Sequence, residues 1–329
     1  MTEYFSNLVC RPVVVARRGD YDPRSTVPSK AFKAEPLAVA KRARVTELAA
    51  AALANAVDHM RRNVRGARAR RDPDFVHQLR VGARRARVVL RLFRKRIGED
   101  RANALGRDLR WVFQVLGELR DRELLLADVV EPLSKEERDP ALSLLATELV
   151  RERKRAAHDV KDALGGKRFE RLLSNLDTLR RELQQEKAAG KRARKWGKKR
   201  LDKRLEAVLS RRDAALGPDE SARHELRKEL KKLRYAAELM RSLWSKKKVK
   251  HYLDRMEALQ DALGALNDVA TGRKLLPLAA ASAPADTSSA VELCERELMA
   301  RLAERAPALA PAFADFEQAA PFWRPASKS

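Results

Sequence analysis

Two sets of basic residues recur at helical spacing in this sequence. The first follows steps of three and four residues, and its members are His77, Arg80, Arg84, Arg87, Arg91 and Arg94. Such steps place side chains on one face of an α-helix, here over about five turns or roughly 25 Å. The second set is His224, Arg227, Lys231 and Arg234, with Glu238 where the first has Arg91. Each set predicts a cationic helix face, called a basic row below.

Rows of this kind suit the binding of phosphate groups. The planar fork of arginine donates two parallel hydrogen bonds to phosphate oxygens and stays charged at cellular pH, whereas lysine acts as a movable point charge. Like charges at these spacings cost about 0.2–0.5 kcal/mol per pair, so an unliganded row carries a penalty of about 1–2 kcal/mol. We expect an anion to offset that penalty, although a solvated charged face is the ordinary explanation for an isolated arginine.

The residues expected to contact an anion include the neighbours that add to the field of each row. They are His77, Arg80, Arg84, Arg85, Arg87 and Arg91 in the first row, and His224, Arg227, Lys231, Lys232 and Arg234 in the second. Each histidine begins a row near a helix N-terminus, where the helix dipole disfavours a cation. We expect a neutral imidazole that donates one N–H to phosphate, with a packed or capping histidine as the alternative.

Both rows belong to a duplicated unit. The stretch 116–121, Leu-Gly-Glu-Leu-Arg-Asp, is matched by 263–268, Leu-Gly-Ala-Leu-Asn-Asp, and the two stretches are 147 positions apart, as are His77 and His224. The 44-residue separation between His77 and Asp121 recurs as well. Because residue types and separation repeat together, we infer an internal duplication of one structural unit.

Acidic residues and glycines in the matched stretch complete the predicted site. Asp121 and Asp268 cannot usefully contact a polyanion, so we expect them to hold arginine forks from the neighbouring helix. The supporting set is Arg120, Asp121, Asn267 and Asp268. Gly117 and Gly264 each cost about 1 kcal/mol inside a helix, which indicates a close approach between helices.

These residues resemble the CHAD family, the conserved histidine α-helical domain. The matches are the His-x-x-Arg-x-x-x-Arg/Lys-Arg/Lys-x-Arg pattern at 77–87, the Leu-Arg-Tyr-x-x-Glu motif at 233–238, the Leu-Gly-x-x-Arg-Asp element at 116–121, and Gln-Asp-x-Leu-Gly-x-x-Asn-Asp at 260–268. The resemblance covers roughly residues 36 to 305. It implies an all-α fold of two pseudo-symmetric four-helix bundles around a basic central groove or channel, and it implies binding of inorganic polyphosphate.

Composition narrows the partners. The 329 residues include 71 Lys and Arg against 46 Asp and Glu, which gives a net charge of +25. A chain this basic attracts nucleic acid, anionic membrane surfaces or polyphosphate. The rows contain almost no aromatic residues, and single-stranded nucleic acid would require stacking platforms. Polyphosphate is therefore the favoured partner, and sequence-independent binding of nucleic acid is the alternative.

No catalytic or cofactor motif is found in the sequence. A phosphate-binding loop with Gly-Lys-Ser/Thr, a His-Glu-x-x-His pair and a nucleophile elbow are all absent. No carboxylate cluster suited to Mg²⁺ lies on the rows. We expect a binding protein and not an enzyme, without a metal or cofactor. A phosphohydrolase or a regulator of a polyphosphate enzyme is the less favoured reading, and polyphosphate-metabolising enzymes are further candidate partners.

The expected cellular context follows from cysteines and apolar segments. Cys10 and Cys294 are the only cysteines, which favours a reducing compartment over a disulfide framework. The N-terminus lacks the pattern of a signal peptide, and no apolar run has the length of a membrane span. We expect a cytoplasmic protein located at polyphosphate granules.

Punctuating prolines and glycines divide the chain into four predicted parts. These are an irregular tail over 1–35, in which 13–16 lie against the body, a first bundle over 36–166, a connecting helix with the second bundle over 167–306, and a tail over 307–329. The predicted helices are 36–70, 72–98, 100–130, 139–164, 168–185, 187–212, 219–244, a helix ending near 272, and a last helix ending near 305. Residues 277–289 are predicted to be a flexible loop, and the lysines at 246–250 are predicted to follow the end of a helix.

Overall fold

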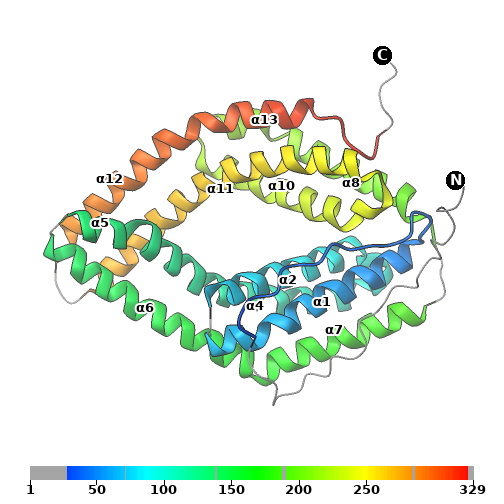
Figure 1. Ribbon diagram of the computed structural model, residues 1–329, viewed down its shortest axis with the longest axis horizontal. Helices are drawn as coiled ribbons and strands as arrows, with labels where there is room; N and C mark the ends of the chain where they lie inside the picture. Colours follow the sequence, from blue (N-terminus) through cyan, green and yellow to red (C-terminus); the bar gives the residue numbers. More distant parts are fainter. Residues whose placement is uncertain (1–27, 71, 138, 187–189, 284–285, 325–329) are drawn as a thin grey trace, which may run out of the picture.

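The computed structural model describes residues 28–70, 72–137, 139–186, 190–283 and 286–324. Within these ranges the regular elements are helices, apart from one isolated antiparallel bridge between Arg44 and Arg192 (Figure 1). The prediction of an all-α fold is confirmed. The predicted contact of residues 13–16 lies outside the described residues.

The helices have the following bounds. They are α1 (Val45–Ala69), α2 (Pro73–Leu92), α3 (Arg94–Ile97), α4 (Glu99–Leu125), the π-helix η1 (Leu126–Val130), α5 (Glu131–Glu136), α6 (Pro140–Gly165), α7 (Lys167–Gln185), α8 (Ala193–Leu209), α9 (Arg212–Leu216), α10 (Glu220–Met240), the 3₁₀ helix η2 (Arg241–Leu243), α11 (Lys246–Ser282), α12 (Ser288–Arg305), the 3₁₀ helix η3 (Ala306–Ala308) and α13 (Leu309–Gln318).

Helix positions follow the repeat found in the sequence. Helix α10 starts 147 positions after α2 (220−73), and α11 starts 147 positions after α4 (246−99). Asp72 caps α2 by accepting a hydrogen bond from the Asp74 backbone N–H, and Asp219 caps α10 in the same way through Ser221. The helices that carry the two basic rows therefore begin with the same capping chemistry.

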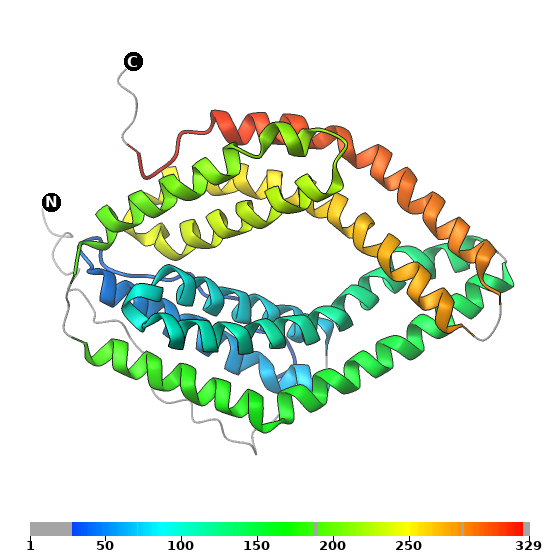
Figure 2. The same ribbon diagram turned by 180° about the vertical axis from the view of Figure 1, so that it is seen from behind.

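The helices form two groups that meet at both ends of an elongated molecule. Helices α1, α2, α4 and α7 make one group, and α8, α10, α11 and α13 make the other (Figures 1 and 2). At one end, the last turn of α4, η1, the first half of α6, the end of α11 and α12 enclose a separate apolar core that includes Leu126, Leu142, Leu276 and Cys294. The large core fills the rest of both groups.

Two predicted boundaries differ from the structure in this arrangement. Helix α7 precedes the second group in the chain but packs against α1 and α4, so it lies with the first group. The predicted tail from residue 307 contains η3 and α13, and Phe313 and Phe316 of α13 are buried against α11. Aromatic burial on the long helix α11 orders this segment despite its prolines.

Three further predictions about helix ends were wrong. The first helix begins at Val45 and not at Pro36, because the Glu47 side chain accepts a hydrogen bond from the Arg44 backbone N–H and fixes the start there. Helix α11 continues through Pro277 to Ser282, where a loop was predicted. Lys246, Lys247 and Lys248 form the first turn of α11, because Trp244 has an extended backbone that ends the preceding helical segment.

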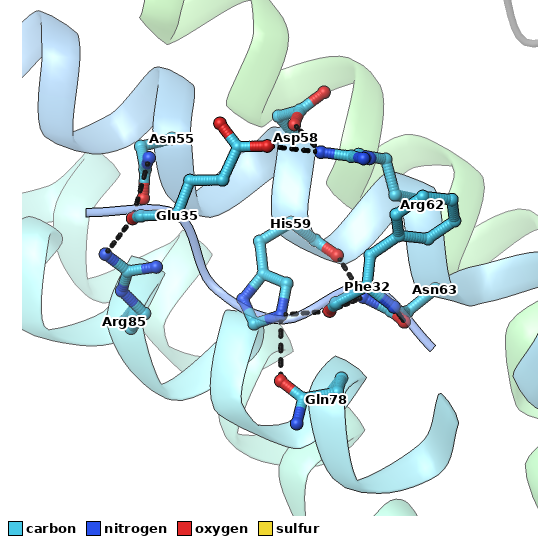
Figure 3. Close-up of polar contacts among 9 residues, drawn as sticks. All are labelled: Phe32, Glu35, Asn55, Asp58, His59, Arg62, Asn63, Gln78 and Arg85. Carbon is cyan, nitrogen blue, oxygen red and sulfur yellow. Dashed lines mark hydrogen bonds and ion pairs between the residues drawn. The ribbon is translucent and has the colours of Figure 1, made fainter. Parts of the chain in front are cut away.

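Residues 28–43 form a segment without regular secondary structure that lies over α1 and α2, called the strap below (Figure 3). The Asn63 side chain accepts from the Phe32 backbone N–H at 3.0 Å and donates to the Phe32 carbonyl at 3.0 Å. Farther along, the Val39 backbone N–H donates to Ser242 Oγ at 3.1 Å. The strap therefore joins the first helix group to η2 of the second.

His59 lies beneath the strap and is buried. Its Nε2 lies 3.0 Å from the Phe32 carbonyl oxygen and 3.2 Å from Gln78 Oε1, so Nε2 carries the proton that both acceptors share (Figure 3). Burial lowers the pKa of His59, and the nearby charges of Arg85 and Arg62 lower it further, against the hydrogen bonds to Phe32 and Gln78. The folded protein therefore holds His59 as a neutral imidazole.

We predict that His59 makes the fold sensitive to acid. Because its pKa is lower in the folded state than in the unfolded chain, the stability that it contributes is present above its ordinary pKa of about 6.5 and is lost as the pH falls below that value. Between pH 7.5 and pH 5 the melting temperature should fall by several degrees. His59→Gln should reduce this fall, whereas His251→Gln, at an exposed position on α11, should leave it unchanged. Equal falls in both variants would contradict the assignment.

Candidate functional site

The two basic rows meet where α2 passes α10. Arg84 of the first row donates a hydrogen bond from Nη1 to Tyr235 Oη of α10 at 2.6 Å. The charges of Arg84 and Arg80 act on Lys231 of the second row, together with that of Arg227. The residues that the structure brings together are Arg80, Arg84, Arg87, Arg227 and Lys231, called the central cluster below.

Carboxylates from α4 and α11 lie beside the central cluster. Asp121 Oδ1 is 3.7 Å from Arg80 Nη1, and the charge of Asp268 acts on Arg227. Burial raises the pKa of Asp121 and of Asp268, and the adjacent arginines partly oppose this rise. These two aspartates therefore neutralise part of the field of the cluster from its edge.

Glycines of the repeat make room for arginine side chains. A Cβ atom on Gly117 would lie 3.4 Å from Arg80 Nη2, and one on Gly264 would lie 3.0 Å from Arg227 Nη1. A close approach between helices was predicted at these positions. In the structure, the group that lies against each glycine is the guanidinium of an arginine from the neighbouring helix. The repeat keeps the same glycine and arginine pair in both halves, which gives the two arginines equivalent settings.

The ring of Phe113 on α4 contacts three arginines of the first row. The guanidinium carbons of Arg80, Arg84 and Arg87 lie 4.7, 4.9 and 5.9 Å from the centre of its ring. Ring faces attract cations by about 0.5–2 kcal/mol, so one phenylalanine favours three like charges at once. The sequence prediction did not include this residue. Its position one helical turn before Gly117 was the available signal.

Arg85, Lys232 and Arg234 were predicted to contact the anion, but the structure directs them away from the central cluster. Arg85 donates to the Glu35 carbonyl of the strap at 3.4 Å, and Lys232 is paired with Glu229 at 2.6 Å. Arg234 is paired with Glu238 at 2.8 Å and with Glu257 at 3.3 Å. Burial alone would lower the pKa of Arg234, but the charge and hydrogen bond of Glu238 outweigh it and raise that pKa.

The histidines and Arg91 lie at the margins of the rows. His77 is exposed, and its pKa is lowered by partial burial and by the charge of Arg120. His224 Nδ1 is 3.3 Å from Asn267 Oδ1, so the supporting residue Asn267 orients that ring. Arg91 is exposed at the far end of the first row.

Arg204 of α8 adds a cation that the sequence prediction missed. Burial lowers its pKa, and the positive charge of Arg91 lowers it further against the attraction of Glu229. Its position in the repeat corresponds to Val57 (204−147), so the duplication did not mark it. Helix α8 thus extends the first row beyond Arg91.

The central cluster is electrostatically strained when it holds no anion. Burial lowers the pKa of Lys231 to about 6, and the charges of Arg84 and Arg227 contribute to that shift. Burial and the charges of Arg91 and Arg110 lower the pKa of Arg87 to about 10. At neutral pH, Lys231 is therefore mainly a neutral amine that can take up a proton when an anion arrives.

Two properties of the described residues bear on the site. No group of three or more His, Cys, Asp or Glu side chains in the described ranges is arranged to hold a metal ion. Among the same residues, no helix combines the length and the apolar character needed to cross a membrane.

A family model and a solved structure that resemble this chain both belong to the same family. A family model described as the CHAD domain matches residues 51–277. The crystal structure of the CHAD domain from the plant Ricinus communis superposes with a TM-score of 0.79 at 27% sequence identity, covering 89% of this chain and 98% of that one. PptA from Streptomyces chartreusis shares the fold with a TM-score of 0.60 at 20% identity, over 84% of this chain and 99% of that one. A search of curated proteins found no match.

We predict that Lys231 lowers the stability of the free protein. Its pKa is about 6 in the folded state and 10.5 ordinarily, so the unfolded chain binds the extra proton between these values. The free energy of unfolding should therefore rise with pH above 6, because stability rises wherever the unfolded state holds more protons. Lys231→Gln should flatten that rise and increase stability at pH 7 by about 1–3 kcal/mol, measured by urea denaturation.

Lys228→Gln provides the matched control for this prediction. Lys228 is on the same helix, is exposed, and is paired with Glu225 at 2.6 Å. The control removes the same charge from α10 without touching the central cluster. A pH slope that Lys231→Gln does not change would show that the lysine stays protonated in the fold.

Proposed function

The chain belongs to the CHAD domain family, and we propose that it binds inorganic polyphosphate through the central cluster. The observation that carries the proposal is that Arg80 and Arg84 of α2 and Arg227 of α10 converge on Lys231, whose pKa is lowered to about 6. A bound polyanion would offset the repulsion among these cations and would protonate the lysine. The family resemblance supports the same ligand.

A linked chain of phosphates suits this arrangement better than separate ions do. Arg80, Arg84 and Arg87 follow one another along α2 at steps of four and three, and Arg227 and Lys231 do so along α10. Once one phosphate is bound, its covalent neighbours meet the next cations as an intramolecular event. Repeating charge along the ligand therefore matches repeating charge along both helices.

The alternative ligand is nucleic acid, which shares the phosphate chemistry. Phe113 already lies under three guanidiniums, so its face is not free to stack on a base. Single-stranded nucleic acid gains about 1–3 kcal/mol per stacked base. Tyr235, the other aromatic side chain at the cluster, is engaged by Arg84 through its hydroxyl and its ring. Because both rings are already in contact with guanidiniums, a ligand without bases is favoured. We further propose that the protein binds without catalysis and resides at polyphosphate granules.

We predict that binding is electrostatic and depends on residues of both rows. Arg84→Glu combined with Lys231→Glu should strongly weaken polyphosphate binding in a filter assay, since it places two negative charges at the centre of the cluster. In the unchanged protein, log K should fall with log salt by a little under one unit for each phosphate neutralised. Polyphosphate should also displace DNA at equal phosphate concentration.

Lys199→Glu combined with Lys203→Glu makes the same change of net charge on α8, at exposed positions outside the central cluster. This control should bind polyphosphate with nearly unchanged affinity, and both variants should keep the helical circular dichroism of the parent. Equal losses in the two variants, or a flat salt dependence, would overturn the proposal.

We also predict that polyphosphate binding takes up a proton at Lys231. The anion raises the pKa of this amine from about 6, so affinity should weaken as the pH rises above that value. Calorimetry in buffers of different ionisation enthalpy at pH 7.5 measures the uptake. Lys231→Arg keeps a fixed charge and should bind without that proton. Because His77 and His224 are present in both proteins, equal uptake would assign the proton to a histidine and contradict the prediction.

A further inference from the structure

A second cation-rich region lies away from the central cluster. An open cavity of about 580 Å³ is bordered by the start of α8, the start of α11 and residues 322–324. Its cationic lining consists of Arg192, Arg194, Lys195, Lys198, Lys248 and Arg324. No member of the central cluster lines it, so the two regions are separate.

Most of these cations have no anionic partner. Arg324 is paired with Asp202, with Nε 2.8 Å from Oδ1, but no Asp or Glu lines the cavity itself. Within the part of the chain that the structure describes, no ion pair involves any of the other five lining cations. The cavity therefore concentrates positive charge without internal neutralisation.

The position of the lysines on their helices increases this imbalance. Lys195 lies in the first turn of α8, and Lys246, Lys247 and Lys248 form the first turn of α11. The positive end of a helix dipole disfavours cations by about 0.3–1 kcal/mol each. Neither N-cap residue, Arg192 or Ser245, makes a side-chain capping hydrogen bond. An anion would satisfy both features at once.

Aromatic side chains form the apolar wall of the cavity. Trp244 and Phe322 meet edge to face at a centroid distance of 5.3 Å, and Trp323 Nε1 donates to Asp202 Oδ1 at 2.9 Å. The Arg194 guanidinium carbon lies 6.0 Å from the Trp244 ring centre. These contacts hold the wall in place, so the cavity pairs a fixed apolar surface with a cationic rim.

We propose that this cavity is a second anion site that binds a triphosphate group, either as inorganic triphosphate or as part of a nucleoside triphosphate. The clustered cations from two helices match several linked phosphates. The aromatic side chains behind them are buried, so they hold the lining in place. The site does not depend on polyphosphate binding at the central cluster.

The test uses Lys195→Glu combined with Lys248→Glu, which reverses one charge on each helix of the cavity. Calorimetric titrations with sodium tripolyphosphate and with ATP should show binding weakened by tenfold or more. Lys199→Glu combined with Lys203→Glu is the control with the same change of charge outside the cavity, and it should bind as the parent does. Both pairs are made in a chain that also carries Arg84→Glu and Lys231→Glu, which separates this site from the central cluster.

Relative affinities identify the source of the triphosphate. ATP binding at least tenfold tighter than tripolyphosphate assigns a nucleotide, and equal affinities assign an inorganic anion. The proposal is overturned if the cavity variant and the control bind equally, or if the chain with the altered central cluster binds neither ligand. Failure of the central cluster to bind polyphosphate would leave this result unaffected, because both pairs are compared in a chain whose central cluster is already altered.

Thermal unfolding provides a second readout that is independent of calorimetry. Glutamate in the first turn suits a helix dipole, so the cavity variant should melt at an equal or higher temperature than its parent without ligand. Tripolyphosphate should raise the melting temperature of the parent and of the control but not that of the cavity variant. A ligand-induced rise in all three proteins would also overturn the proposal.

Discussion

Repulsion among like charges is the constraint on which the architecture of the central site depends. Arg80, Arg84, Arg227 and Lys231 act on one another across two helices from separate halves of the chain. The apolar core at one end of the molecule and the large core in the rest of both helix groups hold those helices in place. Burial of the apolar cores thus supplies the free energy that keeps the cations together. A bound polyanion would relieve the remaining repulsion and so stabilise the folded state.

Local devices reduce the repulsion without removing the positive field. Phe113 offers one ring face to three guanidiniums, and Tyr235 fixes the head of Arg84 through a neutral hydroxyl. The aspartates act at the edge of the cluster, where Asp121 pairs with Arg80 at a long 3.7 Å. By contrast, Arg234 is held by two glutamates at shorter range, which withdraws it from the site. The arginines of the central cluster therefore keep a net positive field, because their partners are uncharged or distant, whereas the charge of Arg234 is neutralised by two nearby glutamates.

Helical period and the repeat predicted the elements that carry the rows, because α2 and α10 owe their bounds to local capping and apolar spacing. Directions of individual side chains depended on partners distant in the chain. Arg85 turns toward the strap, whose path no local pattern encodes. Arg204 joins the first row only through the packing of α8, and its counterpart Val57 is apolar. The lysines at 246–248 were misplaced because the extended backbone at Trp244 separates two helical segments.

The contacts of the strap must form in a fixed order while the chain is synthesised. Its Val39 backbone N–H donates to a hydroxyl 203 positions later in the chain, on Ser242. A ribosome releases the strap long before it releases that acceptor, so the strap can dock on α1 and α2 early but completes its contacts only after the second helix group has emerged. Domains generally fold as units, the N-terminal one first, as the chain is made. In this chain the strap can bind α1 and α2 early, but its bond to Ser242 waits until the second helix group has begun to emerge.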